Sequence, residues 1–411
     1  MHIRRPRGAR LAGLAAGVAL LGTTVGATAG TAGATHVASP KVTARRAVPA
    51  GAEPAAKLFT TSLKGICPNP LIVQTNWLPE ADHAALYELI GAGGTMKQYS
   101  YEGPLGSTGI KLQILSGGPG DAFLPTQATL YAGNPVVRVT PQLVMDTVEK
   151  TLQFSKKFPT VAVVNLQNHD PQMLMYDPSR WKHLGTIADL AAAAKAGAHL
   201  YVSGLTYPYV QYLIEHGVPA GAFIGGYSGD LEKFVTGGGM VLNQGYSDAE
   251  PYLLAHDTPA WGGKPVKYVY ISQYGLNDYP TAIQVRRDKL ASLSRCLTKL
   301  VPMLQQSIVD YFAHPQTVNE VLAKFNPKYS ASYWTTPVAE SVYSDKVQLA
   351  QKIVANSSSG SVGAFNMARL AETDRQLFPI MAKESPGTYV PGIPASQLAT
   401  NKFIDPSIHL P

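Results

Sequence analysis

A dozen residues with the sequence NWLPEADHAALY, shortly after the apolar run 71–73, combine aromatic and ionisable side chains. They include Trp77, Asp82, His83 and Tyr87. A flat ring can stack on a ligand, and ionisable groups can orient its polar atoms. The apolar run predicts a strand, so these side chains follow a strand end. The composition indicates a small-molecule site, with ordinary core packing as the alternative for the two rings.

Two more predicted strands end on similar material. Gly117 and Gly118 follow the run 110–115, and Gln167 follows the run 160–166. A residue without a side chain lets a ligand approach backbone N–H groups, although a plain turn is the alternative. Ligands of open α/β sheets bind beyond the carboxyl ends of strands, so we expect these positions to share one site.

Short β-rich runs alternate with helical patterns along the chain. This alternation predicts an α/β architecture with largely parallel sheets. The predicted strands are 71–77, 110–115, 160–166, 198–204 and 266–272. The helical patterns are DHAALYELIG, TIADLAAAAKAG, YPYVQYLIEHG and the long span 280–325.

Composition limits the class of protein and its partners. The 411 residues are 45% hydrophobic and 15% charged, which is typical of a globular chain large enough for two cores. The net charge of +7 is concentrated at the start, because nine of the 34 Lys and Arg precede Cys67, against a single acidic residue. The remainder is close to neutral, so we expect no nucleic-acid partner.

The N-terminus has the features of an export signal. A cationic stretch to Arg10, the apolar segment 11–21 and small residues predict a cleaved signal peptide over 1–34, followed by a flexible linker over 35–66. Pro6 follows the Arg4–Arg5 pair, which favours the general secretion route over the twin-arginine route. No later run has the ~20 apolar residues of a membrane span. We therefore expect an exported protein without a lipid anchor.

The chain has two cysteines, Cys67 and Cys296. An oxidising compartment would allow a single disulfide between them. Pairing requires α-carbons within about 7 Å, which sequence cannot establish, so the bond stays open at this point.

Five motifs resemble the ABC-transporter substrate-binding proteins that are related to thiamine-pyrimidine synthases, within the nitrate and sulfonate type of group. They are WLPEADHAALY, LQILSGGP, VVNLQNHDPQMLM, HLGTIADL and NQGYSDAEPY, in that order, and the resemblance covers about residues 67–295. It implies a type II periplasmic-binding-protein fold, in which two α/β lobes are joined by a hinge of two crossings. Lobe one would comprise 67–160 and 274–411, and lobe two 161–273.

The same resemblance implies a ligand site between the lobes. Trp77 would be the stacking surface, and Glu250 would face the ligand from the second lobe. Tyr227 would cover the other face of the ligand ring. The polar groups implied beside them are Asp82, His83, Tyr87 and Gln167, with Gln244 and Tyr252 as weaker candidates.

Glu80 departs from the family pattern, in which an Asn is common. A carboxylate favours amino or cationic groups and disfavours sulfonate or nitrate. The implied function is an extracytoplasmic receptor of an ABC importer that delivers a thiamine-type pyrimidine, or another nitrogen heterocycle or amine, to a membrane permease. We expect a monomer without a metal or organic cofactor.

Two other functions were weighed. Fungal relatives are enzymes that build the thiamine pyrimidine from pyridoxal phosphate and their own histidine, and His83 aligns with the motif histidine. Those enzymes carry a cysteine-rich iron site, which two distant cysteines cannot supply. The sequence also lacks the short motifs of serine hydrolases, zinc enzymes and phosphate-binding loops. A secreted sensor or scavenger module would show the same motifs as a transport receptor.

Overall fold

The computed structural model describes residues 55–330 and 334–411. The predicted signal peptide, its cleavage site and most of the predicted linker lie outside these residues. The linker's last part is structured, because helix α1 (Ala55–Leu58) lies within it and Leu63 is fully buried. Cys67 follows directly and is joined to Cys296 by a disulfide, with the two α-carbons 4.9 Å apart.

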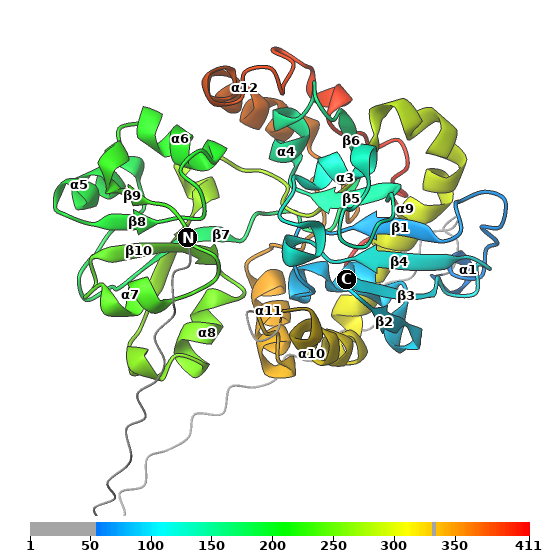
Figure 1. Ribbon diagram of the computed structural model, residues 1–411, viewed down its shortest axis with the longest axis horizontal. Coiled ribbons are helices and arrows are strands. Elements are labelled where there is room, and N and C mark those ends of the chain that lie inside the picture. Colours follow the sequence, from blue (N-terminus) through cyan, green and yellow to red (C-terminus); the bar gives the residue numbers. More distant parts are fainter. Residues whose placement is uncertain (1–54, 331–333) are drawn as a thin grey trace, which may run out of the picture. The chain divides into compact units, whose positions relative to one another are not determined.

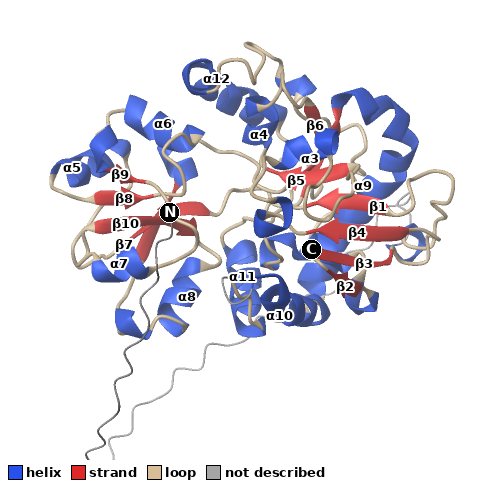
Figure 2. Ribbon diagram, viewed as in Figure 1, coloured by secondary structure: helices blue, strands red, loops and turns tan. Residues whose placement is uncertain are grey.

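The strands form two separate sheets (Figure 2). The seven-stranded sheet has the order β2 (Thr95–Lys97), β3 (Ser100–Pro104), β4 (Lys111–Leu115), β1 (Leu71–Gln74), β5 (Leu143–Asp146), β12 (Ala282–Arg286) and β6 (Thr160–Asn165). The five-stranded sheet has the order β11 (Lys267–Tyr270), β7 (Gln172–Tyr176), β10 (Val241–Tyr246), β8 (His199–Tyr201) and β9 (Phe223–Ile224). The α/β class is as predicted.

Both sheets are mixed, so the expectation of largely parallel sheets is wrong. In the seven-stranded sheet, β1 pairs in parallel with β4 and β5, while β12 runs antiparallel between β5 and β6. The expected helical span 280–325 likewise begins with this strand. Its segment AIQVR is almost entirely buried between two neighbouring strands, and this burial outweighs the helical pattern that follows.

The helices lie on both sheets and continue after the last strand. Figure 1 shows α5 to α8 around the five-stranded sheet and α9 against the seven-stranded one. The remaining bounds are α2 (Ala84–Glu88), α3 (Thr126–Ala132), α4 (Val148–Gln153), α5 (Ile187–Lys195), α6 (Pro208–Glu215), α7 (Glu232–Thr236), α8 (Glu250–His256), α9 (Leu290–Ala313), α10 (Gln316–Ser330), α11 (Val338–Ala350) and α12 (Met367–Glu384). Short 3₁₀ helices are η1 (Ala81–His83), η2 (Gly91–Gly93), η3 (Gly118–Asp121), η4 (Ala220–Ala222), η5 (Pro259–Trp261), η6 (Ile271–Tyr274), η7 (Arg287–Lys289) and η8 (Ala395–Gln397).

The chain passes twice between the sheets. The first crossing follows β6 at Asn165 and reaches β7 at Gln172, and the second runs from β11 to β12. The chain therefore leaves the seven-stranded sheet a few residues after position 160. The two crossings are bonded to each other, since Leu166 N donates to Thr281 O at 3.0 Å and Thr281 Oγ1 to Gln167 Oε1 at 3.3 Å.

Helix α12 also links the two sheets, by side-chain packing and not by a further crossing of the chain. It packs against α6 beside the five-stranded sheet and against α4, which follows β5. Leu370 and Leu377 of α12 belong to one buried cluster with Leu152 of α4 and Leu213 of α6. The two sheets thus share part of their core through this helix.

Candidate functional site

The loop after β1 carries Trp77 and is shaped by two glycines. The N–H of Gly117 donates to the Trp77 carbonyl at 2.9 Å, and a Cβ on Gly117 would lie 2.4 Å from the Asn76 carbonyl carbon. Gly118 has a φ of +60° and lies against the Trp77 ring, which an added Cβ would approach to 3.3 Å. These glycines permit the close packing that holds Trp77 in place. The Gly117 N–H is already used for this purpose.

Trp77 belongs to a group of rings from distant parts of the chain. Its ring centroid lies 6.4 Å from that of Trp334 in an edge contact and 6.3 Å from that of Phe123. We call Trp77, Tyr99, Tyr329 and Trp334 the aromatic group. Leu253 of α8 packs against it, so a side chain that follows the five-stranded sheet reaches the loop of the seven-stranded one.

The loop after β10 supplies Glu250 at the start of α8. This side chain is 1% exposed and accepts hydrogen bonds from the Tyr227 hydroxyl and, at 2.6 Å, from the Tyr246 N–H. Burial raises the pKa of Glu250 to about 7, although these donors hold it lower than burial alone would. Tyr227 is itself buried, with its ring in edge contact with Tyr201 at 5.5 Å.

Helix α11 buries its polar face, and its apolar Leu349 is 43% exposed. The buried side chains are Glu340, Ser341, Ser344, Asp345 and Gln348. Soluble helices normally bury their apolar face. A helix that buries polar groups faces other polar groups or a ligand.

Five carboxyl groups from three segments gather here, and we call them the loop acids. They are Glu80 and Asp82 after β1, Asp248 and Glu250 after β10, and Glu340 on α11. Burial raises the pKa of Glu80, and the neighbouring Asp248 and Glu250 raise it further. The pKa of Glu340 is raised by burial and then by Glu80, Asp248 and Glu250.

Asp82 and Asp248 are hydrogen-bonded to each other, which joins the loops of the two sheets. Two carboxyl groups can form this bond only if one of them holds a proton. Burial raises the pKa of both groups, and the bond raises the pKa of Asp82 while it lowers that of Asp248. The pair therefore shares one proton. Asp248 also accepts from Ser344 Oγ at 3.1 Å.

No Lys or Arg forms an ion pair with a loop acid in the described part of the chain. The nearby base is His83, whose Nε2 lies 3.7 Å from Glu80 Oε1. Burial lowers the pKa of His83 to about 3, so the ring is neutral at physiological pH and its contact with Glu80 is not an ion pair. The loop acids consequently have no positive partner within the described residues.

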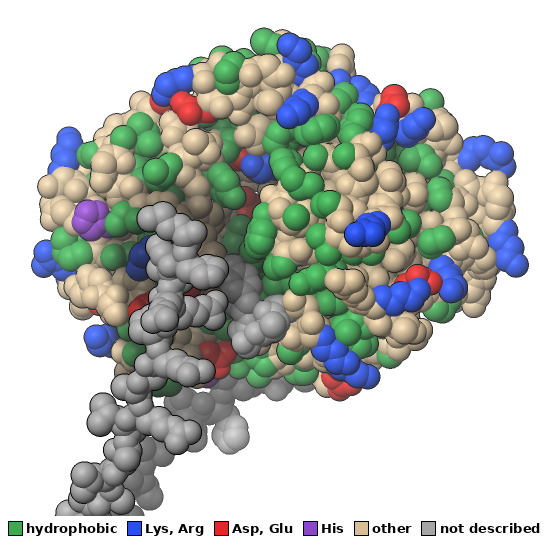
Figure 3. All heavy atoms as spheres, in the orientation of Figure 1, with side chains coloured by type: hydrophobic (Ala, Val, Ile, Leu, Met, Phe, Trp, Pro, Cys, Tyr) green, Lys and Arg blue, Asp and Glu red, His purple; other side chains and the backbone are tan. Residues whose placement is uncertain are grey.

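A second set of carboxyl groups, which we call the hinge acids, likewise forms no ion pair among the described residues, but two of its members have a basic side chain near enough to lower their pKa. These are Glu149, Asp170 and Asp278, beside the two crossings. Lys150 lowers the pKa of Glu149 and Arg369 that of Asp170, against the larger raising effect of burial. On the face drawn in Figure 3, Lys and Arg side chains are spread over much of the surface.

Gln167 reaches the loop acids through a relay of buried side chains rather than directly. Its Nε2 donates to Gln348 Oε1 at 3.1 Å, and Gln348 Nε2 donates to Ser344 Oγ at 3.0 Å. Ser344 in turn donates to Asp248. The relay connects the first crossing with Asp248 in the loop after β10.

The structure brings together Trp77, Asp82, His83, Tyr227 and Glu250 from the sequence-predicted set. It places Tyr87 in the core of the seven-stranded sheet, 2% exposed and stacked on Tyr101 at 5.8 Å. The weaker candidate Gln244 is occupied within the five-stranded sheet, where its Oε1 accepts from Ser203 N at 2.8 Å and Tyr209 Oη at 2.5 Å. The other weaker candidate, Tyr252, packs on Tyr343 of α11 at 5.6 Å.

Sequence reasoning missed Asp248, Trp334 and Glu340. The last two lie more than 250 residues beyond Trp77, in a segment where no motif was recognised. The polar residues at helical spacing in ESVYSDKVQ were the available signal, because they predict a helix with an unusual polar stripe.

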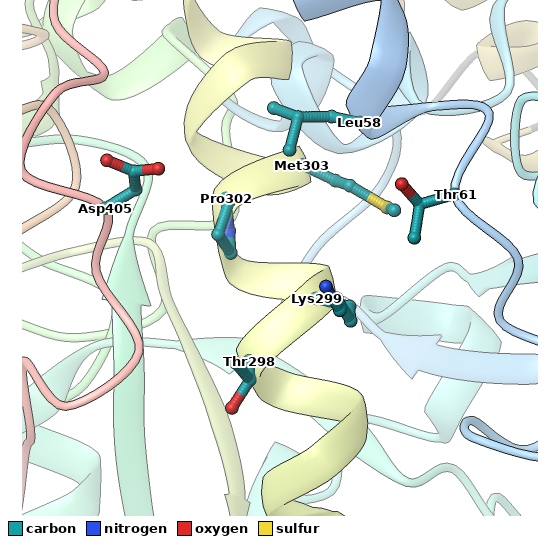
Figure 4. A pocket seen from close by; sticks show the side chains of 7 residues that line it. All are labelled: Leu58, Thr61, Thr298, Lys299, Pro302, Met303 and Asp405. Carbon is teal, nitrogen blue, oxygen red and sulfur yellow. The ribbon is translucent and has the colours of Figure 1, made fainter. Parts of the chain in front are cut away.

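A cavity of about 150 Å³ lies elsewhere, between α1 and α9 (Figure 4). Pro302 and Met303 of α9 line it, with Leu58 and Thr61 on one side and Asp405 on the other. The Asp405 carboxylate is occupied, since its Oδ1 accepts from Ser407 N at 2.9 Å and Ser407 Oγ at 2.6 Å. Thr298 and Lys299 also line the cavity, so its polar side chains are few and include one cationic group, and it has no aromatic ring that could stack on a solute.

Within residues 55–330 and 334–411, no three His, Cys, Asp or Glu side chains are arranged to hold a metal ion. No helix there combines the length and apolar character that a bilayer crossing requires.

Neither a protein-family model nor a curated protein sequence matches this chain. Solved structures do match. The periplasmic sulfonate-binding protein SsuA of a putative sulfonate ABC transporter from Methylobacillus flagellatus has a TM-score of 0.50 at 12% identity, over 83% of this chain and 94% of its own. An ABC transporter structure from Parabacteroides distasonis has a TM-score of 0.47 at 10% identity, over 82% and 100%. The alkanesulfonate-binding SsuA from Xanthomonas axonopodis has 0.45 at 10% identity, over 81% and 99%.

The fold is therefore that of the periplasmic substrate-binding proteins, as the sequence resemblance implied. An identity of 12% shows the fold alone and leaves the solute to be argued from the side chains of this chain.

Proposed function

We propose that this protein is the extracytoplasmic receptor of an ABC importer and that it captures a small organic solute with a basic nitrogen. A thiamine-type pyrimidine, another nitrogen heterocycle or an amine would fit. One observation carries the proposal: the aromatic group and the loop acids converge from loops of both sheets. The receptor would work as an exported monomer that delivers its solute to a membrane permease.

The side chains suit such a solute for two reasons. The rings of Trp77 and Trp334 provide flat apolar surfaces for a heterocycle, and an indole face also attracts a cation. The loop acids accept hydrogen bonds from amino groups and lower the free energy of a positive charge. The same carboxyl groups would repel sulfonate or nitrate, so the solute in the names of the neighbouring structures does not suit this site.

Entry of the solute requires the binding loops to separate. Glu250 and Glu340 are 1% and 5% exposed, so a solute cannot reach them in the arrangement described above. We expect an open form in which the β1 and β10 loops part, and a closed form stabilised by the solute that the permease recognises. The solute can shift this equilibrium only by its preference for the closed form.

A thermal-shift screen of the purified protein tests the proposal. A solute present at 100 times its Kd should stabilise the protein by about 2.7 kcal/mol. We expect shifts from amines and nitrogen heterocycles, and none from alkanesulfonates or nitrate. The proposal fails if sulfonates shift the melting temperature while basic compounds do not, or if neither class does.

A matched pair of tryptophan variants places the site. Trp77→Ala should remove the shift. Trp181→Ala should keep it, because Trp181 donates from Nε1 to Gly239 O at 2.8 Å in the region of the five-stranded sheet. An undiminished shift in the Trp77→Ala protein would remove that residue from the site.

A further inference from the structure

The Asp82–Asp248 bond is the direct carboxyl contact between the loops of the two sheets. It exists because one proton lies between two oxygen atoms that would otherwise repel. Asp82 belongs to η1, and Asp248 lies between β10 and α8. Replacement of this proton by another group would therefore act on both loops at once.

The surroundings of the pair supply no substitute positive charge. Ionisable groups facing it from the adjoining elements are Glu80, His83, Asp170, Glu250, Tyr270, Tyr311, Glu340, Tyr343 and Asp345. Apart from the neutral His83, every member of this set is an acid or a phenol. Loss of the shared proton without a replacement would leave buried negative charges together, which is costly.

Glu340 provides an independent indication that a ligand belongs here. It comes from α11 rather than from either loop, is 5% exposed, and its Oε2 has no hydrogen-bond partner among the described residues. Its electrostatic neighbours are, in order, Glu80, Asp248 and Glu250, so the carboxyl group is directed toward the loop acids. A buried acceptor without a donor is uncommon in folded proteins and calls for a missing partner.

We infer that a positively charged nitrogen of the solute lies between Asp82 and Asp248 and takes the place of the proton that these two carboxyl groups share. This inference rests on the proposed receptor function and specifies its ligand chemistry. An ammonium or protonated ring nitrogen offers N–H donors to both carboxylates, and Glu340 Oε2 is a further acceptor. We take the occupant to be an organic cation, because the aromatic group lies beside the loop acids and offers ring faces to an organic solute.

The exchange balances in charge and atoms. An ammonium ion enters, a carboxylic acid hydrogen-bonded to a carboxylate becomes two carboxylates around the ammonium, and one proton leaves to solvent. No bond other than O–H breaks, and no oxidant or other reactant is required. Binding should therefore strengthen as pH rises, with the Kd falling by about tenfold per pH unit while the empty pair remains protonated.

Benzylamine, which remains protonated throughout the range, tests the exchange against its neutral analogue benzyl alcohol. We expect the Kd of benzylamine for the full-length protein to be lower at about pH 8 than at about pH 6, by as much as about 100-fold where the empty pair keeps its proton over this range. Calorimetric titration in two buffers with different ionisation heats should show about one proton released per benzylamine bound. Equal affinities at the two pH values, or equal binding of benzyl alcohol, would overturn the inference.

Two amide variants separate the shared proton from general effects of burial. Asp82→Asn and Asp248→Asn retain the size of the side chain, and each should abolish proton release. The matched control is Asp374→Asn on α12, since Asp374 is 3% exposed with a pKa raised to about 7 by burial. This control should release the same proton as the wild type. Proton release that persists in both Asp82→Asn and Asp248→Asn would refute the exchange.

The outcome also distinguishes this inference from the proposed function. If the neutral 4-amino-5-hydroxymethyl-2-methylpyrimidine binds with no proton release and benzylamine does not bind, the exchange is wrong and the receptor function stands. If neither compound binds and the wider screen yields no solute, both proposals fail.

Discussion

The loop acids and the hinge acids are both largely buried carboxyl groups, yet only among the hinge acids does a nearby Lys or Arg lower the pKa, as Lys150 does for Glu149 and Arg369 for Asp170. Arg369 donates to the carbonyls of Asn168 at 2.8 Å and Asp278 at 3.4 Å, and so binds both chain crossings. It also lies 3.6 Å above the Tyr279 ring. The loop acids hold the shared Asp82–Asp248 proton and no ion pair with Lys or Arg in the described residues.

The difference indicates what each group is for. A charge balanced within the chain fixes the geometry of a connection, whereas carboxyl groups without an internal base cost stability unless an external cation arrives. The crossings are thus held by the protein itself. We propose that the binding loops are completed by the solute.

Removal of Arg369 should have the largest effect. Arg369→Met removes two charged hydrogen bonds and the counter-charge of Asp170, so we expect a loss of about 3 kcal/mol in the free energy of unfolding. Chemical denaturation measures it. Arg375→Met on the same helix is the control, because Arg375 forms a solvent-exposed pair with Glu372 and its loss should leave the stability nearly unchanged. Equal losses would mean that Arg369 does not hold the crossings.

Stability of the solute-free protein should depend on pH. The folded-state pKa of Glu250 is about 7, above the 4.5 of an unperturbed Glu, so the folded state holds a proton that the unfolded state releases in this window. The free energy of unfolding should then fall as pH rises from about 4.5 to about 7, by about 3 kcal/mol for this group. Thermal melting across the range checks it.

His83 should produce the opposite slope between about pH 3 and pH 6.5, a range that overlaps the one set by Glu250. Its folded-state pKa of about 3 lies below the 6.5 of an unperturbed His, so its contribution is lost as pH falls from 6.5. Between about pH 4.5 and about pH 7 the buried carboxyl groups with raised pKa values outnumber His83, so the net stability should still fall as pH rises. Glu250→Gln should flatten the fall between about pH 4.5 and about pH 7, and an unchanged slope would show that Glu250 is not a source of it.

Glu340→Gln should have the smallest effect and the opposite sign from Arg369→Met. Burial and the neighbouring acids raise the pKa of Glu340, so its ionisation destabilises the folded protein increasingly as pH rises. The amide cannot ionise, so we expect the solute-free variant to gain about 1 kcal/mol over the wild type at alkaline pH. Affinity for a cationic solute should fall at the same time. Melting curves with and without the solute measure both changes, and a variant that is less stable and binds unchanged would contradict the assignment.

Much of the fold could be predicted from sequence because its signals are local. The apolar runs before Trp77 and Gln167 are strands, and the two-lobe type of fold follows from the order of the motifs. Which strands pair with each other in a sheet is not determined by local sequence. The antiparallel insertion of β12 depends on contacts with β5 and β6, more than 100 residues earlier.

The site was predictable only in part for the same reason. Trp77 and Glu250 follow strands, where α/β folds place ligands. Glu340 and Trp334 enter from a C-terminal helix whose position depends on tertiary packing. Tyr87 has the residue type of a ligand-stacking group, but its spacing on α2 directs it toward Tyr101 and the core.

Hydrogen–deuterium exchange with and without the most stabilising solute of the screen tests the central claim most directly. If one solute is held by both loops, the backbone amides of 76–84 and of 246–254 should become protected together, while those around the α1–α9 cavity should not change. Protection confined to one loop, or located at the α1–α9 cavity, would contradict a shared site.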